Sequence, residues 1–340
     1  MPIAPPSAEI AAQARDRLLA LATPVGALGR LGELAVWISS VQGECPPRPV
    51  ERVRGVVFAG DHGVVAHGVT PFPAAVTALM VRAFADGTAG VAVLARQHGA
   101  HLRVADIGVD DDLQGLDVSR HKVRRSSGAI HLEDALSTDE ARQALDAGRL
   151  IADEEIDSGA DLLIAGDMGI GNTTPSAALI GATLGLPASE VTGRGTGVDD
   201  EGLRRKQQVV SEALTRAGDR VADPVDRLTA LGSADLAAQV GFLSRAAERG
   251  VPVLLDGVIS VACALVAEDY APGCARWFAA GHRSPEPAQS LALSKLGLEP
   301  VLDLGMRLGE GSGAMAAVPV VRSAALLLRE MALLADVLSG

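Results

Sequence analysis

The stretch Ile164-Ala-Gly-Asp-Met-Gly-Ile-Gly-Asn-Thr-Thr-Pro175 holds a short apolar run, a glycine-rich turn and the beginning of a helix. The apolar run is typical of a strand that is covered on both faces. Pro175 fits the first turn of a helix, where its missing N–H costs no hydrogen bond. A strand that passes through a short turn into a helix is the repeating unit of α/β proteins. We therefore expect a parallel sheet with helices on both faces.

The same order of apolar run, turn and helix recurs along most of the chain. Besides 162–165, the runs predicted to be strands are 54–59, 102–107, 251–255, 276–280 and 301–304. The helices expected between them are 74–85, 89–98, 138–158, 175–184, 200–217, 234–248, 258–266 and 286–296. Nearly every run ends in a turn with Gly or Asp. Right-handed crossovers bring these turns to one edge of the sheet, where open α/β sheets bind ligands.

Both ends of the chain are expected to be helical. Helices are predicted over 7–21 and 31–41, ahead of the spacer Pro46-Pro47-Arg48-Pro49, and over 314–338 with a bend at Pro319. The predicted fold class is therefore α/β, with an open parallel, Rossmann-like sheet and a small helical domain built from both termini. We predict that residues 46–311 form the nucleotide-binding sheet domain and that residues 1–45 and 312–340 form the helical domain.

The overall composition excludes several classes of protein. A net charge of -12 at pH 7 opposes a general nucleic-acid or anionic-membrane surface, which needs Lys and Arg. No apolar run reaches the ~20 residues of a membrane span without interruption, and the N-terminus lacks a signal-peptide pattern. The three cysteines, Cys45, Cys263 and Cys274, have neither disulfide-framework nor metal-motif spacing. We expect reduced thiols in a cytoplasmic protein.

The glycine-rich turn after Gly166 is predicted to bind an anion at a helix N-terminus, because free backbone amides and the helix dipole attract phosphate. The residues that would surround the anion are Gly169, Gly171, Asn172, Thr173 and Thr174. The turn matches neither the dinucleotide GxGxxG nor the P-loop, so a tight turn without a ligand is the alternative. Lys206, in a helix that follows a second glycine-rich loop, either reaches back to a phosphate or is solvated.

The stretch from Met306 to Met315 places one acid, Glu310, between glycines that let a ligand approach closely. Glu310 is either a catalytic group or a carboxylate that stabilises the start of a helix. Other polar turns are less specific. His62 and His67 lack a companion at metal-ligand spacing, and Ser284 does not lie in the GxSxG elbow of a hydrolase.

Four motifs together resemble those of one known family, the nicotinate-nucleotide:dimethylbenzimidazole phosphoribosyltransferases of cobalamin lower-ligand assembly. They are Gly166-Asp-Met-Gly-Ile-Gly-Asn-Thr-Thr-Pro175, Leu255-Asp-Gly-Val-Ile-Ser260, Gly281-His-Arg-Ser-Pro-Glu286 and Arg307-Leu-Gly-Glu-Gly-Ser-Gly313. The resemblance runs from Pro24 to the C-terminus. It implies transfer of phosphoribose from nicotinate mononucleotide to a benzimidazole-type base, giving α-ribazole 5′-phosphate and nicotinate. It also implies a homodimer and no cofactor or metal.

The resemblance implies roles for single residues. Glu310 matches the family's general base, which takes the azole N–H proton as the other ring nitrogen attacks the anomeric carbon. The loop 169–174 and Lys206 would hold the 5′-phosphate, and Ser284 would border the nucleotide.

The base pocket implied by the resemblance is formed by Asp167, Phe72, Met80 and Leu308. Many relatives carry Glu where Asp167 stands, and Ser and Gln at the positions that match Phe72 and Met80. Polar pocket groups discriminate between ligands more strongly than apolar ones. We therefore predict a relaxed or shifted preference for the base.

Two other functions fit a nucleotide-binding α/β protein. A nicotinamide-cofactor dehydrogenase needs fingerprint glycines and an acidic residue ~20 positions further on, and neither is at the expected place. A non-catalytic nucleotide-binding relative would keep the anion loop without turnover, and the presence of Glu310 counts against it.

Overall fold

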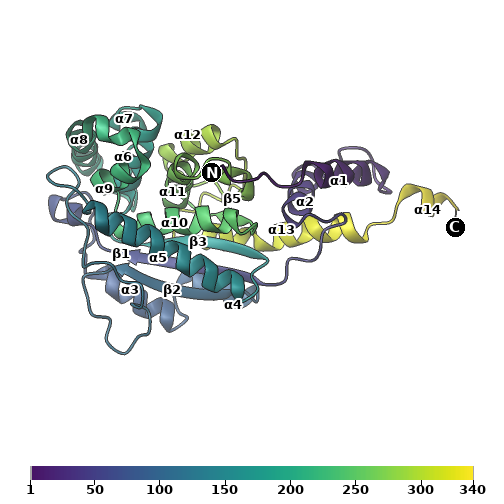
Figure 1. The fold of residues 1–340 in the computed structure, drawn as a ribbon, viewed down its shortest axis with the longest axis horizontal. Helices are drawn as coiled ribbons and strands as arrows, with labels where there is room; N and C mark the ends of the chain where they lie inside the picture. The colour runs from purple at the N-terminus through teal and green to yellow at the C-terminus, as the bar shows by residue number, and fades with distance from the viewer. Residues whose placement is uncertain (1, 340) are drawn as a thin grey trace.

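The structure is a computed structural model that describes residues 2–339. Among these residues, six strands form one parallel sheet in the order β2-β1-β3-β4-β5-β6. Figure 1 labels β1, β2, β3 and β5 of this sheet. Their bounds are β1 Val53–Gly60, β2 His101–Gly108, β3 Leu162–Met168, β4 Val253–Leu255, β5 Phe278–His282 and β6 Pro300–Leu302. Each overlaps a strand predicted from the sequence, so the parallel sheet is confirmed.

The α-helices follow the predicted pattern closely. They are α1 Ala8–Ala20, α2 Arg30–Gln42, α3 Val76–Ala85, α4 Gly90–Gln97, α5 Thr138–Asp157, α6 Thr173–Leu184, α7 Ala188–Val191, α8 Asp200–Ala217, α9 Pro224–Leu231, α10 Ala234–Glu248, α11 Val258–Tyr270, α12 Pro287–Leu296, α13 Ser312–Glu330 and α14 Leu334–Ser339. Three short 3₁₀ helices are η1 Gly63–His67, η2 Gly218–Ala222 and η3 Cys274–Trp277. The sequence pattern did not predict α7 and α9, which are short, although Asp223 and Pro224 give α9 a cap and an N1 proline.

The last predicted helix differs from the structure. α13 continues through Pro319 and ends at Glu330, and a separate α14 follows. The break arises because the segment between them bonds to the N-terminal part of the chain. Leu333 forms an antiparallel bridge with Leu21, and the amide of Ala22 donates to the carbonyl oxygen of Ala332 at 2.9 Å. These bonds replace the helical ones.

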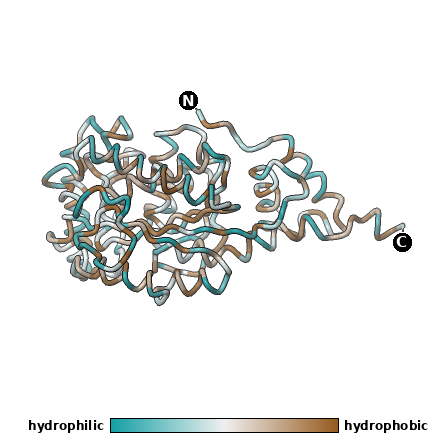
Figure 2. The backbone as a smooth tube through the Cα atoms, turned by 60° about the horizontal axis from the view of Figure 1, so that its bottom comes forward, coloured by the Kyte–Doolittle hydropathy of each residue, from teal (hydrophilic) through white to brown (hydrophobic). Residues whose placement is uncertain are grey.

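Helices cover both faces of the sheet, and strand side chains alternate between them. Val56 and Phe58 of β1 point into a core shared with helices such as α5, α6, α10 and α11. Val57 and Ala59 point the other way, into a core shared with α3, α4 and α13. The strands at the centre are mostly hydrophobic along their length (Figure 2). This two-sided burial explains the continuous apolar runs in the sequence.

Helices from both ends of the chain pack together beside the sheet, as the sequence predicted. Leu34 and Ala35 of α2 share a small core with Ala324 and Leu328 of α13 (Figure 1). The first half of α13, however, packs against the sheet through Met315. One helix therefore takes part in both cores, and the division into residues 1–45 with 312–340 and residues 46–311 stays a prediction.

Two segments have the length and hydropathy of a membrane span, 76–97 and 312–330. The first is interrupted between α3 and α4. In the second, 56% of its most apolar 18-residue window is buried inside the protein, because α13 packs on the sheet. Their apolar character is explained by these internal contacts.

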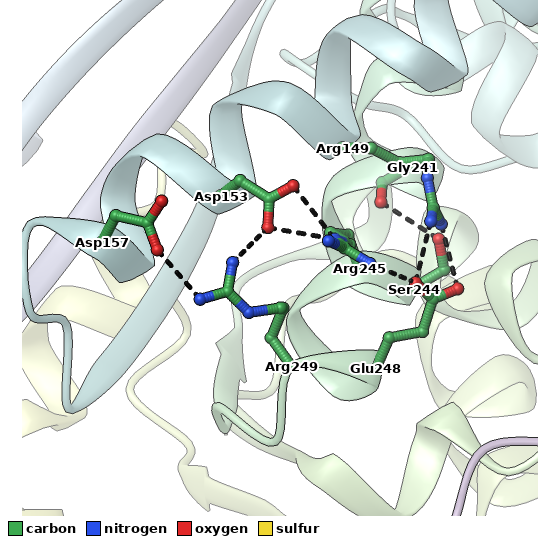
Figure 3. Close-up of polar contacts among 8 residues, drawn as sticks. All are labelled: Arg149, Asp153, Asp157, Gly241, Ser244, Arg245, Glu248 and Arg249. Carbon is green, nitrogen blue, oxygen red and sulfur yellow. Dashed lines mark hydrogen bonds and ion pairs between the residues drawn. The ribbon is translucent and has the colours of Figure 1, made fainter.

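Two helices, α5 and α10, cross with their backbones in contact. A Cβ on Gly148 would lie 1.7 Å from the carbonyl oxygen of Ala238, so only glycine fits there. Beside the crossing, charged side chains of the two helices pair in a row (Figure 3). Arg149 and Glu248 form a bidentate pair with distances of 2.9 and 2.8 Å.

Candidate active site

A cavity of about 350 Å³ opens at the carboxyl ends of the strands. Its walls come from the segments that follow β1, β3, β4, β5 and β6. The strand order places β1 between β2 and β3. The chain first runs from β1 to β2 on one side and then crosses back to β3 on the other side, so the strand order reverses between β1 and β3. Open α/β sheets bind their ligands at such a switch point. The polar strand-end turns of the sequence do meet at one edge.

Glu310 lines this cavity in an unusual backbone conformation. Its φ of 67° lies in the left-handed region that few residues other than glycine adopt. Gly166 of β3 makes room for it, because a Cβ there would lie 2.2 Å from the carbonyl oxygen of Glu310. Strained residues of this kind persist only where neighbouring contacts fix them, and they occur often at functional sites.

The carboxylate of Glu310 lies at the N-terminus of α4. It is 5% exposed, and its Oε2 accepts a hydrogen bond from the amide of Val91 at 3.1 Å. Burial raises the pKa of Glu310, the Val91 amide acts in the opposite direction, and the negative charge of Asp256 raises it further. A buried acid with a raised pKa that is still anchored by an amide has the properties of a general base.

Asp256, directly after β4, connects the strand edge to the start of α13. Its Oδ2 accepts a hydrogen bond from the amide of Gly311 and its Oδ1 one from the amide of Ala314, both at 3.0 Å. His282 at the end of β5 places its Nε2 3.4 Å from Oδ1 of Asp256. Burial acts to lower the pKa of His282, but Asp256 outweighs it and the pKa is raised.

The glycine-rich loop forms another part of the cavity wall. α6 begins at Thr173, so Pro175 is its third residue rather than its first. The amides of Ile170, Asn172 and Thr174 bond within the protein. Among residues 2–339, those of Gly171 and Thr173 have no partner and are available to an anion.

The side chains of the loop have different surroundings. Thr173 lines the cavity, together with Gly169, Gly171 and Asn172. Thr174 is fully buried in α6 and does not line it. The loop therefore has the amides of Gly171 and Thr173 and the Thr173 hydroxyl available for a ligand.

Lys206 is buried, which excludes the alternative of a solvated side chain. It is 1% exposed, and its Nζ donates to the Thr173 hydroxyl at 2.6 Å and to the carbonyl oxygen of Gly193 at 3.2 Å. Burial lowers the pKa of Lys206 to about 8. A buried ammonium group that shares a hydroxyl with the anion loop is well placed to hold a phosphate.

The remaining wall is largely apolar. Phe72 and Leu308 are 45% and 55% exposed and line the cavity with the half-buried Met80. Asp167 also lines it and accepts hydrogen bonds from Asn172 and Gln239, both at 2.7 Å. Burial raises the pKa of Asp167, and the nearby Asp235 raises it further.

The other singled-out side chains lie in different places. Ser284 is buried and lines the cavity near the loop that enters α8. His62 faces Asp235, with 3.4 Å between Nε2 and Oδ2, whereas the His67 ring packs against His131. The two histidines therefore do not act as a pair. Across residues 2–339, no three His, Cys, Asp or Glu side chains gather in a way that could hold a metal ion.

Several cavity residues received no role from the sequence, among them Asp256, His282 and Arg307. The strand-end turns in which Asp256 and His282 stand were recognised from the sequence. The local sequence does not show, however, which of these turns contacts the segment that carries Glu310. Arg307 has no hydrogen-bond or ion-pair partner among residues 2–339 and lies at the cavity wall. The sequence could have indicated a role for Arg307, because it begins the fourth motif directly before Leu308.

Comparison with known proteins agrees with these features. A phosphoribosyltransferase family model matches residues 3–337. Nicotinate-nucleotide--dimethylbenzimidazole phosphoribosyltransferase of Mycolicibacterium paratuberculosis is 54% identical over 334 residues, which cover 98% of this chain and 96% of that protein. The enzyme of the same name from Mycobacterium tuberculosis is 53% identical, with 97% and 92% covered.

The fold is also similar to solved structures. The crystal structure of CobT from Thermus thermophilus has a TM-score of 0.93 and 43% identity, and covers 97% of this chain and 98% of its own. A second structure from that organism, described as the phosphoribosyltransferase, has a TM-score of 0.92 and 41% identity, with 98% and 99% covered. These matches confirm the resemblance drawn from the four motifs. The chain is therefore an enzyme that belongs to the phosphoribosyltransferase family containing the nicotinate-nucleotide–dimethylbenzimidazole phosphoribosyltransferases.

Proposed function

We propose that this chain transfers phosphoribose from nicotinate mononucleotide to a benzimidazole-type base, giving α-ribazole 5′-phosphate and nicotinate for cobalamin lower-ligand assembly. The observation that carries the proposal is the pairing of two groups in one cavity. The buried acid Glu310 lines one wall, and the buried cation Lys206, bonded to the anion loop, lines another. A phosphoribosyl donor and an acidic N–H acceptor need these two groups.

The chemistry balances with a single carboxylate. The free lone pair of one azole nitrogen forms a bond to the anomeric carbon, and the proton of the other azole nitrogen passes to Glu310. The bond between the anomeric carbon and nicotinate breaks, and its electron pair returns to the pyridinium nitrogen. The leaving group becomes neutral at that nitrogen, so it needs no general acid. Attack from the face opposite the leaving group inverts the configuration from β to α.

The donor carries two anionic groups, and the cavity offers two cations for them. Lys206, the free amides of Gly171 and Thr173, and the Thr173 hydroxyl would hold the 5′-phosphate. Arg307 would be available to the carboxylate of the nicotinate group. Arg194, the third cation at the cavity, already pairs with Asp200 and the carbonyl oxygen of Val198. Ser284 would border the nucleotide.

The acceptor would sit against the apolar wall. Phe72, Met80 and Leu308 would contact the base, with Asp167 behind it. Apolar contacts separate similar bases only weakly, by about 10–200-fold per added group. We infer a relaxed or shifted preference. In a competition among benzimidazole, its dimethyl form and adenine, a strong preference for the dimethyl form would contradict this inference.

We further infer a homodimer in the cytoplasm, with a helical domain of residues 1–45 and 312–340 beside a sheet domain of residues 46–311. An apolar groove of about 850 Å³ between α1, α2 and the loop that joins them supports the dimer. Leu19 and Val25, which line this groove, are exposed. Sedimentation velocity tests the dimer, and a monomer at micromolar concentration would contradict it.

The variant Glu310→Ala tests the proposed function. Loss of the general base should lower turnover of nicotinate mononucleotide with dimethylbenzimidazole by at least ~10², while binding of the mononucleotide remains. The matched control is Glu299→Ala, which removes an exposed glutamate and should leave turnover unchanged. Wild-type protein that binds the mononucleotide without turnover would indicate a non-catalytic relative. Full turnover in Glu310→Ala would refute the assignment of the base.

A further inference from the structure

We propose that Asp256 is a positioning residue for the reaction: from the end of β4 it fixes the backbone at Glu310 and keeps a second negative charge beside the reacting carboxylate. This inference rests on the proposed function, in which Glu310 takes the azole proton. It assigns a role to a residue that does not itself take the proton.

The hydrogen bonds of Asp256 hold the turn that carries Glu310. Gly311 follows Glu310 directly, and its amide donates to Asp256 Oδ2, while the amide of Ala314 donates to Oδ1. Both oxygens of one buried carboxylate therefore bind the first turn of α13. An anion at this place also compensates the positive end of the helix dipole. Asp256 lies in a different strand-end turn, so it ties α13 to the sheet edge.

The backbone of Glu310 needs such a constraint. Its left-handed φ of 67° is unfavourable for a residue with a Cβ. Contacts on two sides keep it there: the Gly166 backbone lies against its carbonyl oxygen, and Asp256 holds the next amide. The conformation directs the side chain toward the α4 N-terminus, where Val91 binds it. Without Asp256 the turn would be free to relax and the carboxylate would lose its fixed position.

The charge of Asp256 has a separate effect. Asp256 is 4% exposed, so water screens its charge poorly, and a like charge favours the protonated form of Glu310. A general base works best when its pKa lies near the operating pH, which requires a carboxyl pKa well above the ordinary value. Burial and the neighbouring charge of Asp256 both raise the pKa of Glu310 in this way.

Other charged groups surround Glu310 and must be considered with Asp256. Those on the cavity wall from neighbouring elements include Asp167 in β3, His282 at the end of β5 and Arg307 on its own segment. His282 lies 3.4 Å from Asp256, and both of its ring nitrogens are buried without a hydrogen-bond partner among residues 2–339. A protonated His282 would cancel the charge of Asp256. The test must therefore separate the two.

The experiment measures kcat against pH for Asp256→Asn in two backgrounds, wild type and His282→Gln. The rate falls on the acidic side where Glu310 becomes protonated. In the His282→Gln background, Asp256→Asn should move this acidic limb down by about half a pH unit or more, because it removes a like charge. The plateau kcat should fall by about 10-fold, because Glu310 is held less well. In the same His282→Gln background, Asp303→Asn, which changes an exposed strand-end acid, is the control and should change neither the limb nor the plateau.

The possible results decide between roles. In the His282→Gln background, a lower plateau kcat with an unmoved acidic limb would show that the charge of Asp256 does not raise the pKa of Glu310. An unchanged plateau kcat would show that Asp256 does not position Glu310. If Asp256→Asn does not fold, as judged by thermal unfolding, Asp256→Ser gives the same test, because its hydroxyl oxygen still accepts a helix amide. Wild-type protein without turnover would refute the proposed function, and this inference with it. Wild-type turnover with no effect of Asp256 refutes this inference alone.

Discussion

Two of the places where the fold depends on a missing Cβ are the crossing of α5 and α10 and the contact of β3 with the turn before α13. A Cβ on Gly148 would lie 1.7 Å from the carbonyl oxygen of Ala238. One on Gly166 would lie 2.2 Å from the carbonyl oxygen of Glu310. Both places have a glycine, because only a residue without a Cβ lets two backbones approach so closely.

The polar groups around the two contacts differ. Beside the helix crossing, each cation has a carboxylate partner, as Arg245 with Asp153 and Arg249 with Asp157 (Figure 3). Beside the strand contact, Glu310 is buried with one amide and a raised pKa. Fully paired polar groups contribute stability and no reactivity, whereas a buried, incompletely paired acid is available for chemistry. Close packing alone therefore does not identify the site.

The substitution Gly148→Ala should have the largest effect on stability. The added methyl group would overlap the backbone of α10, so the two helices must separate and the core beneath them must open. Overpacking of this kind costs about 3 kcal/mol or more. Urea denaturation measures the loss in free energy of unfolding. Turnover per folded molecule should stay at the wild-type level.

The control for Gly148→Ala is Gly32→Ala in α2. A Cβ there would make ordinary contacts with Leu18 and Leu28, the nearest at 3.5 Å. Alanine favours the helix over glycine by ~1 kcal/mol, so this variant should be stabilised. Equal destabilisation of the two variants would show that the crossing is not a special contact.

The substitution Gly166→Ala should instead act on the reaction. The methyl group would displace the backbone of Glu310 by an ångström or so, and a shift of that size in a catalytic group costs about 10²-fold in rate. Stability should change less than in Gly148→Ala, because the turn before α13 can move toward the cavity. The control is Gly55→Ala in β1, whose Cβ would meet side-chain ends at 3.3 and 3.4 Å and a backbone oxygen only at 3.8 Å. Wild-type kcat in Gly166→Ala would contradict the comparison.

The fold could be predicted because its signals are local. Apolar runs such as 54–59 and 162–165, with their turns, already require strands covered on both faces. The end of α13 could not be predicted in this way. It depends on Leu333 pairing with Leu21, a contact between opposite ends of the chain that no local pattern records.

The candidate site was only partly predictable for the same reason. Glu310 and the anion loop stand among glycines and could be recognised by type. For Lys206 the sequence left a phosphate contact and a solvated side chain both open, because helix position alone does not show that Thr173 and Gly193 enclose its ammonium group. Asp256 was visible only as the end of a strand, since its partners Gly311 and Ala314 lie far along the sequence.

Lys206 allows a test of the difference between stability and function. Its pKa is lowered from 10.5 to about 8, so the folded state releases a proton that the unfolded state keeps between these values. Stability of the ligand-free protein should therefore rise as the pH increases from about 8 to 10.5. Below about pH 8 the charged, buried lysine carries its full cost, and Lys206→Met should be more stable there by about 2 kcal/mol.

The same variant should bind the mononucleotide more weakly, because the phosphate loses its buried cation. In the wild-type protein, binding at pH 9 should take up close to one proton, since the phosphate returns the pKa of Lys206 toward its ordinary value. Calorimetry in buffers of different ionisation enthalpy measures this uptake. A destabilised Lys206→Met at neutral pH would contradict the cost of the buried charge, and binding without proton uptake would show that the lysine is not the phosphate cation.

The smallest expected effect belongs to the ion pairs beside the helix crossing. Arg249 bridges Asp153 and Asp157 of α5, but its side chain is about one-third exposed and that of Asp157 is mostly exposed. Water already screens such charges, so Arg249→Ala should lower the free energy of unfolding by less than about 1 kcal/mol. The loss should shrink further in 1 M salt, where screening is stronger. If Arg249→Ala cost as much as Gly148→Ala, the charged row rather than the glycine contact would hold α5 against α10. The backbone contact at Gly148 argues against this, because it remains when the side-chain charges are removed.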